Sequence, residues 1–182
     1  MIFELTALFF VLIYVTWKLS TLAGRLDILH RRKDLMRESL EIQLAWREHI
    51  FTEMLQSGDL PIEHQTMAAR VLLNIDRGWQ QSPLEYFAAE SDLTNLLIDI
   101  FQSPTVLDSF RANPNALQRL TELAAACRKV ALARRFHNDA VGALQLLRVR
   151  ASVRWFRLHG YAEWPRPIDM ADSIPGSLEQ LR

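Results

Sequence analysis

The first stretch of the chain constrains its fold most, because it is apolar on every face of a helix. Between Ile2 and Trp17 the only charged side chain is Glu4. A helix that is apolar all round belongs in a core or a membrane, whereas a surface helix keeps a polar face. These residues span about 24 Å as a helix, and extension to Gly24 gives about 34 Å, enough for a hydrocarbon core of about 30 Å. We therefore expect residues 1–19 to form a transmembrane anchor.

Two alternatives to an anchor stay open. A cleaved signal peptide needs a basic start and small residues at its cleavage site. Here the start carries Glu4, and Leu22-Ala23-Gly24 matches a cleavage site poorly. A buried core helix is the second alternative, and the lack of a polar face speaks against it. The sequence favours the anchor over both.

Basic residues follow the apolar stretch and none precedes it: Lys18, Arg25, Arg31, Arg32 and Lys33. The positive-inside rule then places the bulk of the chain in the cytoplasm and the N-terminus outside. We expect a single-pass protein of the cell (inner) membrane. Trp17 and Lys18 are candidates for its interface, since aromatic rings and snorkelling lysines favour the headgroup level.

Composition narrows the class of the remaining chain. The 182 residues hold 21 basic and 21 acidic side chains, so no net charge attracts nucleic acid. The single cysteine, Cys127, excludes an internal disulfide and a cysteine-based zinc site. Glycine is scarce and leucine, alanine, arginine and glutamate are abundant, a composition that predicts an all-α fold.

Helix signals divide the chain into four helices. An apolar stripe predicts one helix from the anchor to about Gln56, and Ser57-Gly58-Asp59-Leu60-Pro61 ends it. A short second helix is expected to about Asp76, followed by a break over 77–81. Ser82-Pro83-Leu84-Glu85 is a capping box that starts the third helix, which runs to about Gln102. After a loop over 103–115, the fourth helix is expected from Asn115 to Leu158.

These helices predict an N-terminal transmembrane helix that continues into an antiparallel bundle of four helices over residues 20–160. The alternative is three long rods, with the second and third helices nearly collinear. From residue 161 to 182, prolines and scattered acids predict a mostly disordered tail.

Residues 131–141, Ala-Leu-Ala-Arg-Arg-Phe-His-Asn-Asp-Ala-Val, resemble a block typical of the LemA family. Looser similarity covers about residues 20 to 150 and includes Phe110 to Leu120, Ala89-Glu90 with Leu93, and Ile42 to Arg47. His137 stands where that family usually has tyrosine. The resemblance implies a helical bundle on a membrane anchor, with no established catalytic activity or cofactor.

Polar residues interrupt the apolar stripe of the fourth helix at Arg134 and Asn138, with Asp139 adjacent. We expect a buried polar network that fixes helix register. The alternative is a recognition site for a small polar ligand. In a four-helix bundle Asp139 would lie level with Arg31 to Lys33, whereas in the three-rod fold it would lie near Arg47.

Arginines and aromatic residues alternate between 148 and 164, which predicts a segment at an anionic membrane interface. Its candidate residues are Arg154, Trp155 and Arg157. Pairing of the basic fourth helix with acidic helices is the simpler alternative, because residues 33–101 hold twelve acids and five bases. Nucleic acid is disfavoured.

The sequence carries none of the motifs that mark catalysis. It has no His-Glu-x-x-His pair, no glycine-rich phosphate loop and no Gly-x-Ser-x-Gly elbow. We expect no enzyme, cofactor or metal. The predicted function is a membrane-anchored scaffold or adaptor with membrane lipid and a protein partner, or a second copy, as its contacts. The alternative is a small polar-ligand sensor.

Overall fold

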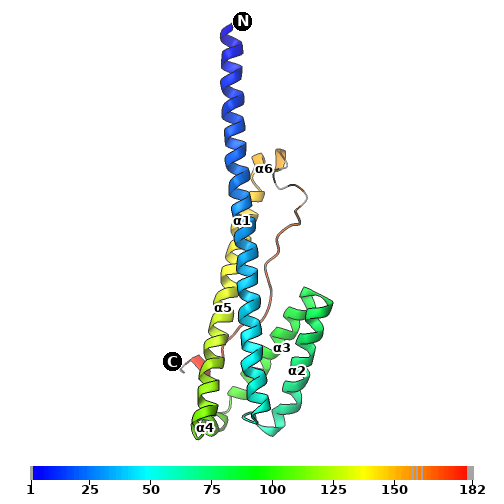
Figure 1. Cartoon of the computed structure of the whole chain (residues 1–182), viewed down its shortest axis with the longest axis vertical. Helices are drawn as coiled ribbons and strands as arrows, with labels where there is room; N and C mark the ends of the chain where they lie inside the picture. Colours follow the sequence, from blue (N-terminus) through cyan, green and yellow to red (C-terminus); the bar gives the residue numbers. More distant parts are fainter. Residues whose placement is uncertain (1, 157, 159, 161, 180–182) are drawn as a thin grey trace. The chain divides into compact units, whose positions relative to one another are not determined.

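A computed structural model of the chain describes residues 2–156, 158, 160 and 162–179 (Figure 1). The described residues form helices and connecting segments without a β-strand, which confirms the all-α class. The helices of this described part are α1 (Ile2–Gln56), α2 (Ile62–Gln81), α3 (Pro83–Phe101), α4 (Pro104–Arg111), α5 (Pro114–Arg148), α6 (Ala151–Trp155) and α7 (Gly176–Glu179).

The chain divides into two compact units, which differ from the predicted division at residues 19 and 160. The first unit comprises Met1–Met36 and Phe136–Pro167, and the second comprises Arg37–Arg135 and Ile168–Arg182. Helices α1 and α5 each contribute residues to both units, so every unit is built from segments far apart in the sequence.

Helix α1 begins in the apolar stretch and ends at Gln56, as the sequence predicts. Its end is a Schellman motif, in which Gly58 adopts a φ of 71°. The Gly58 amide donates to the Leu55 carbonyl at 3.2 Å, and the Asp59 amide donates to the Met54 carbonyl at 3.1 Å. Two carbonyls of the last turn are thereby satisfied, so the helix stops at this position.

By length and composition, α1 is the one helix in the described part of the chain that could cross a membrane. None of its apolar window is buried within the protein. Phe9, Phe10 and Leu12 are each more than half exposed, on different sides of the helix. Transfer of each such side chain out of water is worth about 1.5–3 kcal/mol. The apolar stretch therefore lacks the cover that a core helix would have.

The rest of the first unit is held by a small apolar cluster. Leu26 of α1 is buried with Leu144 and Leu147 of α5 and with Val153 of α6. Leu22, Leu29 and Leu158 pack around them. This cluster fixes α6 beside α1, a few turns after the apolar stretch (Figure 1).

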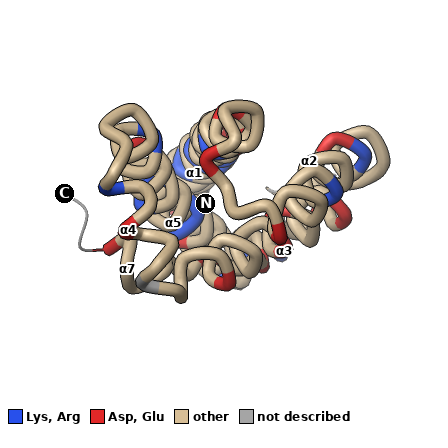
Figure 2. Tube along the Cα trace, turned by 90° about the horizontal axis from the view of Figure 1, so that it is seen from below, with Lys and Arg blue, Asp and Glu red and all other residues tan. Residues whose placement is uncertain are grey.

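Helices α2 and α3 of the second unit form an antiparallel hairpin, so the alternative fold, in which they are nearly collinear, is wrong. Both views show them side by side (Figures 1 and 2). The start of α2 meets the end of α3, where His64 Nδ1 lies 3.9 Å from Asp99 Oδ2. At the other end the rings of Trp79 and Tyr86 are 5.1 Å apart. Ser82 caps α3 as predicted, because its hydroxyl accepts from the Glu85 amide at 3.2 Å.

Within the second unit α1 and α5 also run antiparallel. Arg119, near the start of α5, forms a bidentate ion pair with Asp59, just beyond the end of α1, at 2.7 and 3.0 Å. Further along both helices, Trp46 and Lys129 line the same groove. The core of this unit draws on α1, α2, α3, α4 and α5, with Leu44, Phe51, Leu93, Phe101 and Leu123 among its fully buried side chains.

The C-terminal segment corrects the prediction of a mostly disordered tail. Ile168, Met170 and Leu178 are buried in the core of the second unit. The Arg128 guanidinium donates to the Leu178 carbonyl at 3.3 Å, and the Ser177 hydroxyl donates to the Phe101 carbonyl at 2.8 Å. Prolines exclude a long helix here but not an extended segment that packs on helices. Residues 161 and 180–182 of the predicted tail lie outside the described residues.

Three helix boundaries also differ from the prediction. α2 continues through the expected break to Gln81. The expected loop over 103–115 contains α4, which begins at a proline in the position that helices favour. α5 ends at Arg148 instead of continuing to Leu158, because Arg150 is extended, with φ of −61° and ψ of 135°.

An ion pair binds the C-terminal segment to α5, and we expect its loss to make that segment more mobile. Arg134 Nε and Nη2 donate to the Asp172 carboxylate at 2.7 and 2.9 Å, in a bidentate pair that is about a quarter exposed. Asp172→Asn should lower the free energy of unfolding by about 1 kcal/mol, because partial exposure screens the charges. Hydrogen exchange of the Ala171 amide should accelerate, while the exposed neighbour Asp169→Asn leaves it unchanged. Equal exchange in both variants would contradict the role of this pair.

Candidate functional site

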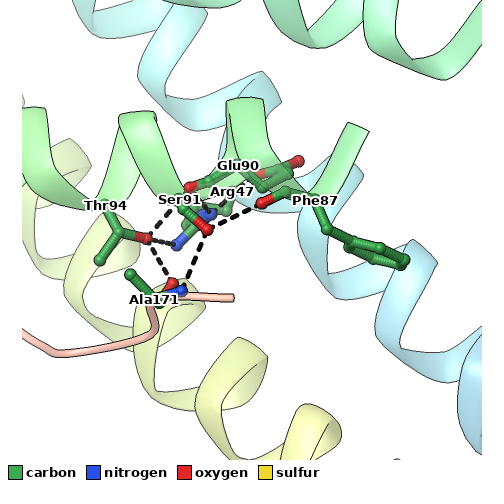
Figure 3. A network of polar contacts seen from close by, with 6 residues as sticks. All are labelled: Arg47, Phe87, Glu90, Ser91, Thr94 and Ala171. Atoms are coloured by element: carbon green, nitrogen blue, oxygen red, sulfur yellow. Dashed lines mark hydrogen bonds and ion pairs between the residues drawn. The ribbon is translucent and has the colours of Figure 1, made fainter. Parts of the chain in front are cut away.

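A buried ion pair joins α1 to α3 at the centre of the second unit (Figure 3). Arg47 is 1% exposed and Glu90 is fully buried, and Arg47 Nη2 lies 2.6 Å from Glu90 Oε2. The same guanidinium donates to the Glu90 carbonyl at 3.2 Å and to Thr94 Oγ1 at 3.0 Å. Such a pair gives little net stability over an apolar core, but removal of one partner leaves an uncompensated buried charge.

The C-terminal segment completes this network through its backbone. Thr94 Oγ1 lies 3.1 Å from the Glu90 carbonyl and 3.0 Å from the Ala171 carbonyl, so its single hydrogen can serve either acceptor. The Ala171 amide donates to Ser91 Oγ at 3.0 Å, and Ser91 donates to the Phe87 carbonyl at 2.8 Å (Figure 3). The polar centre therefore ties α1, α3 and the C-terminal segment together.

Burial sets the protonation of the groups around the pair. It raises the pKa of the Glu90 carboxyl, and the Arg47 guanidinium acts in the opposite direction. Burial and the neighbouring Glu90 carboxylate raise the pKa of the Tyr86 hydroxyl. Burial also raises the pKa of the half-buried Glu48 carboxyl, with Glu90 as the next cause. Tyr86 consequently stays protonated throughout the physiological range.

Cys127 of α5 borders the same cluster, and its thiol is expected to be unreactive in the folded protein. The residue is 5% exposed, and burial raises the pKa of the thiol, although Arg47 acts against that rise. Because only the thiolate attacks a maleimide, labelling should be at least about tenfold slower than at an exposed cysteine. A Cys127→Ala, Leu132→Cys variant supplies that exposed comparison on the same helix. Equal labelling rates would contradict the burial of Cys127.

Glu90 was not among the predicted network residues, although its spacing along the sequence indicates a buried acid. Phe87, Glu90 and Leu93 follow one another at three-residue steps, so the acid interrupts an apolar stripe just as Arg47 does on α1. Two opposite charges on separate apolar stripes predict a buried pair.

Of the four predicted network residues, the two arginines take different acidic partners. Arg47 bonds to Glu90, whereas Arg134 is held by Asp172. Asn138 is half-buried and Asp139 is exposed. A single network of all four stays a prediction. A small ligand could take the guanidinium of Arg134 only by displacing Asp172.

The membrane-interface candidates lie in the first unit. The Lys18 ammonium is 5.8 Å from the ring centre of Tyr14 and 5.9 Å from that of Trp17, which is 60% exposed. Arg154 and Trp155 are exposed on α6, Trp155 at 87%. Arg157 lies outside the described residues.

An apolar groove of about 600 Å³ lies in the second unit and is open to solvent. Ile42, Gln43, Ala45, Trp46, His49 and Lys129 line it. Ile42 and Trp46 are 57% and 47% exposed, and the rings of Trp46 and His49 are 5.5 Å apart. Among the residues that the structure describes, no three His, Cys, Asp or Glu side chains gather as metal ligands would.

Comparison with protein-family models, with curated proteins and with solved structures found no match to this chain.

Proposed function

We propose that this protein is a membrane-anchored helical adaptor that binds a protein partner in the groove around Trp46. The observation that supports this most is the continuity of α1, which carries both the exposed apolar stretch and the groove residues. One helix would thus carry both the membrane anchor and most of the binding surface.

The anchor would cross the inner membrane once, with the N-terminus outside and the second unit in the cytoplasm. The cations that follow the apolar stretch support this orientation. The resemblance to the LemA family agrees with an N-terminal membrane anchor. We further propose that α1, α2, α3 and α5 form an antiparallel bundle. Two antiparallel pairs, α2 with α3 and α1 with α5, support that bundle.

Binding explains the structure better than catalysis does, because the polar cluster around Arg47 and Glu90 is not accessible to a substrate. Arg47 and Glu90 are almost completely buried and bond to each other, and Thr94, which accepts from Arg47, bonds to the C-terminal segment. The groove instead offers apolar carbon with a polar rim, the composition of a protein interface. Trp46, which lines the groove and is 47% exposed, belongs to a residue type that is enriched among energetic hot spots. A helix with apolar residues at three- and four-residue steps would fit it.

Photocrosslinking in native membranes tests this proposal. A benzophenone amino acid at Ile42 should form an adduct with one protein, and Trp46→Ala should weaken that adduct at least tenfold. An adduct of twice the 21.1 kDa chain mass would identify a second copy as the partner. The same probe at Leu73 of α2, which is also 57% exposed, is the matched control. Similar adducts from both positions, or none from Ile42, would contradict the groove as a binding site.

A further inference from the structure

We infer that the turn from Arg150 to Phe156, which contains α6, is a second membrane contact that docks on anionic lipid headgroups beside the anchor. The inference rests on the proposed membrane anchoring of α1 and adds a lipid-binding surface to it. Its basis is a set of contacts within the first unit, where α6 packs against the part of α1 that leaves the bilayer.

The length of the membrane-spanning part of α1 sets the depth at which α6 packs against it. A hydrocarbon core of about 30 Å takes about twenty helical residues, so a span that begins at Phe3 ends near Leu22. The headgroup layer adds about 5–7 Å, which reaches approximately Leu26. Val153 of α6 is fully buried against Leu22, Leu26 and their neighbours. The α6 turn therefore lies at the level of the headgroups when α1 spans the membrane.

The outward side chains of this turn have the chemistry of an interfacial segment. Trp155 is 87% exposed and Phe156 is 51% exposed. Val153 of the same helix is instead buried in the small apolar cluster. Arg150 and Arg154 are exposed on the same turn, and Arg25 is exposed on the adjacent helix. Of the nearby acids, Asp27 is paired with Arg31, and Glu163 is exposed. Aromatic rings with a surplus of arginine are typical of a surface that binds anionic lipid.

Buried hydrogen bonds hold the turn in place before any lipid binds. The buried Arg148, at the end of α5, donates to the carbonyls of Ala162, at 2.7 Å, and of Glu163. Its guanidinium also lies 5.3 Å from the ring centre of Trp164. Gln145 donates to the Pro165 carbonyl at 2.8 Å. The segment that follows α6 is thus tied to α5, and α6 itself begins only a few residues after α5 ends, so docking costs little additional ordering.

Single-tryptophan variants of the full chain in liposomes provide the test. One variant keeps Trp155 and carries phenylalanine at the other four tryptophans: Trp17, Trp46, Trp79 and Trp164. All four are about half exposed, so the changes spare the core. Matched variants keep only Trp17, in the anchor, or only Trp46, in the groove. Each is exposed to iodide in water and to lipids that carry a spin label at a shallow depth.

We expect the shallow spin label to quench Trp155, and iodide to be excluded from it, in vesicles of phosphatidylcholine with phosphatidylglycerol. Quenching should fall in phosphatidylcholine alone. Each of Arg150→Gln and Arg154→Gln should lower the ratio of docked to undocked turn about fivefold, the equivalent of about 1 kcal/mol per basic residue.

Three results would overturn the inference in distinguishable ways. If iodide quenches Trp155 as strongly as Trp46 while lipid quenches Trp17, the turn does not dock but the anchor stands. If Trp155 is shielded from both quenchers, a protein and not lipid covers it. If iodide reaches Trp17, the anchor itself fails, and the second contact fails with it.

Discussion

Replacement of Arg47 by methionine is expected to lower the free energy of unfolding of the second unit by about 3–5 kcal/mol at neutral pH. The change leaves the fully buried Glu90 without its counter-charge and removes the hydrogen bond to Thr94. Methionine fills a similar volume, so a cavity contributes little to the loss. Urea denaturation in detergent micelles, followed by circular dichroism, measures the effect.

The loss in free energy of unfolding that Arg47→Met causes should become smaller as the pH falls. In the native protein burial raises the pKa of Glu90, and Arg47 and the hydrogen bond to Tyr86 oppose the rise. In the variant only the Tyr86 hydrogen bond opposes it, so the pKa of Glu90 rises further. A carboxyl whose folded-state pKa lies above its unfolded value stabilises the fold below the unfolded pKa. That stability is lost as the pH rises through the folded pKa. The variant should therefore be closer to wild type at pH 5 than at pH 7.5.

Two controls separate this effect from a general loss of charge. The double variant Arg47→Met, Glu90→Leu removes both charges and should recover most of the stability, since an apolar pair of similar volume often equals a buried ion pair. Arg37→Met disrupts the more exposed α1 pair with Glu41 and should cost less than about 0.5 kcal/mol. Wild-type stability of Arg47→Met at neutral pH, or a double variant weaker than the single one, would contradict the account.

Gly78→Ala should destabilise the hairpin of α2 and α3 by about 2 kcal/mol. A Cβ atom at Gly78 would lie 2.8 Å from the backbone nitrogen and Cα of Tyr86 and 2.9 Å from the Glu85 carbonyl carbon. Backbone cannot move aside as a flexible side chain can, so the helices would have to separate. This cost outweighs the gain of about 1 kcal/mol that alanine normally brings within a helix.

Gly142→Ala in α5 is the matched control, because a Cβ there meets nothing within 4 Å. It should stabilise its helix by up to about 1 kcal/mol. Thermal unfolding of the two variants should therefore shift in opposite directions. A stabilising effect of Gly78→Ala would show that the close approach of the hairpin is wrong.

Local signals in the sequence predicted the elements that depend on local chemistry. The end of α1 followed from Gly58, and the start of α3 followed from Ser82 and Glu85. The all-α class and one membrane-length helix followed from composition and hydropathy. These features are decided by residues within a few positions of one another, so periodicity and capping rules suffice for them.

Features that depend on distant contacts escaped prediction. The C-terminal segment resembles a disordered tail because its prolines exclude a helix, yet Ile168 and Leu178 occupy places in the core and Ala171 bonds to α3. The partner of Arg47 also depends on how the helices pack, and not on local sequence. Glu90 is 43 positions away, and only the arrangement of α1 against α3 brings the two charges together.

A spin-label scan of α1 in liposomes tests the central claim, that this helix passes from the bilayer into the helical units without interruption. Single cysteines from Leu5 to Leu35, in a Cys127→Ala background, would carry nitroxides whose access to oxygen and to a water-soluble nickel complex is compared. We predict that Leu5 to Trp17 favour oxygen on every face, and that accessibility then oscillates with a helical period, with minima at Leu22, Leu26 and Leu29. Helical oscillation throughout Leu5 to Trp17, or loss of that stretch from the mature chain, would contradict the claim.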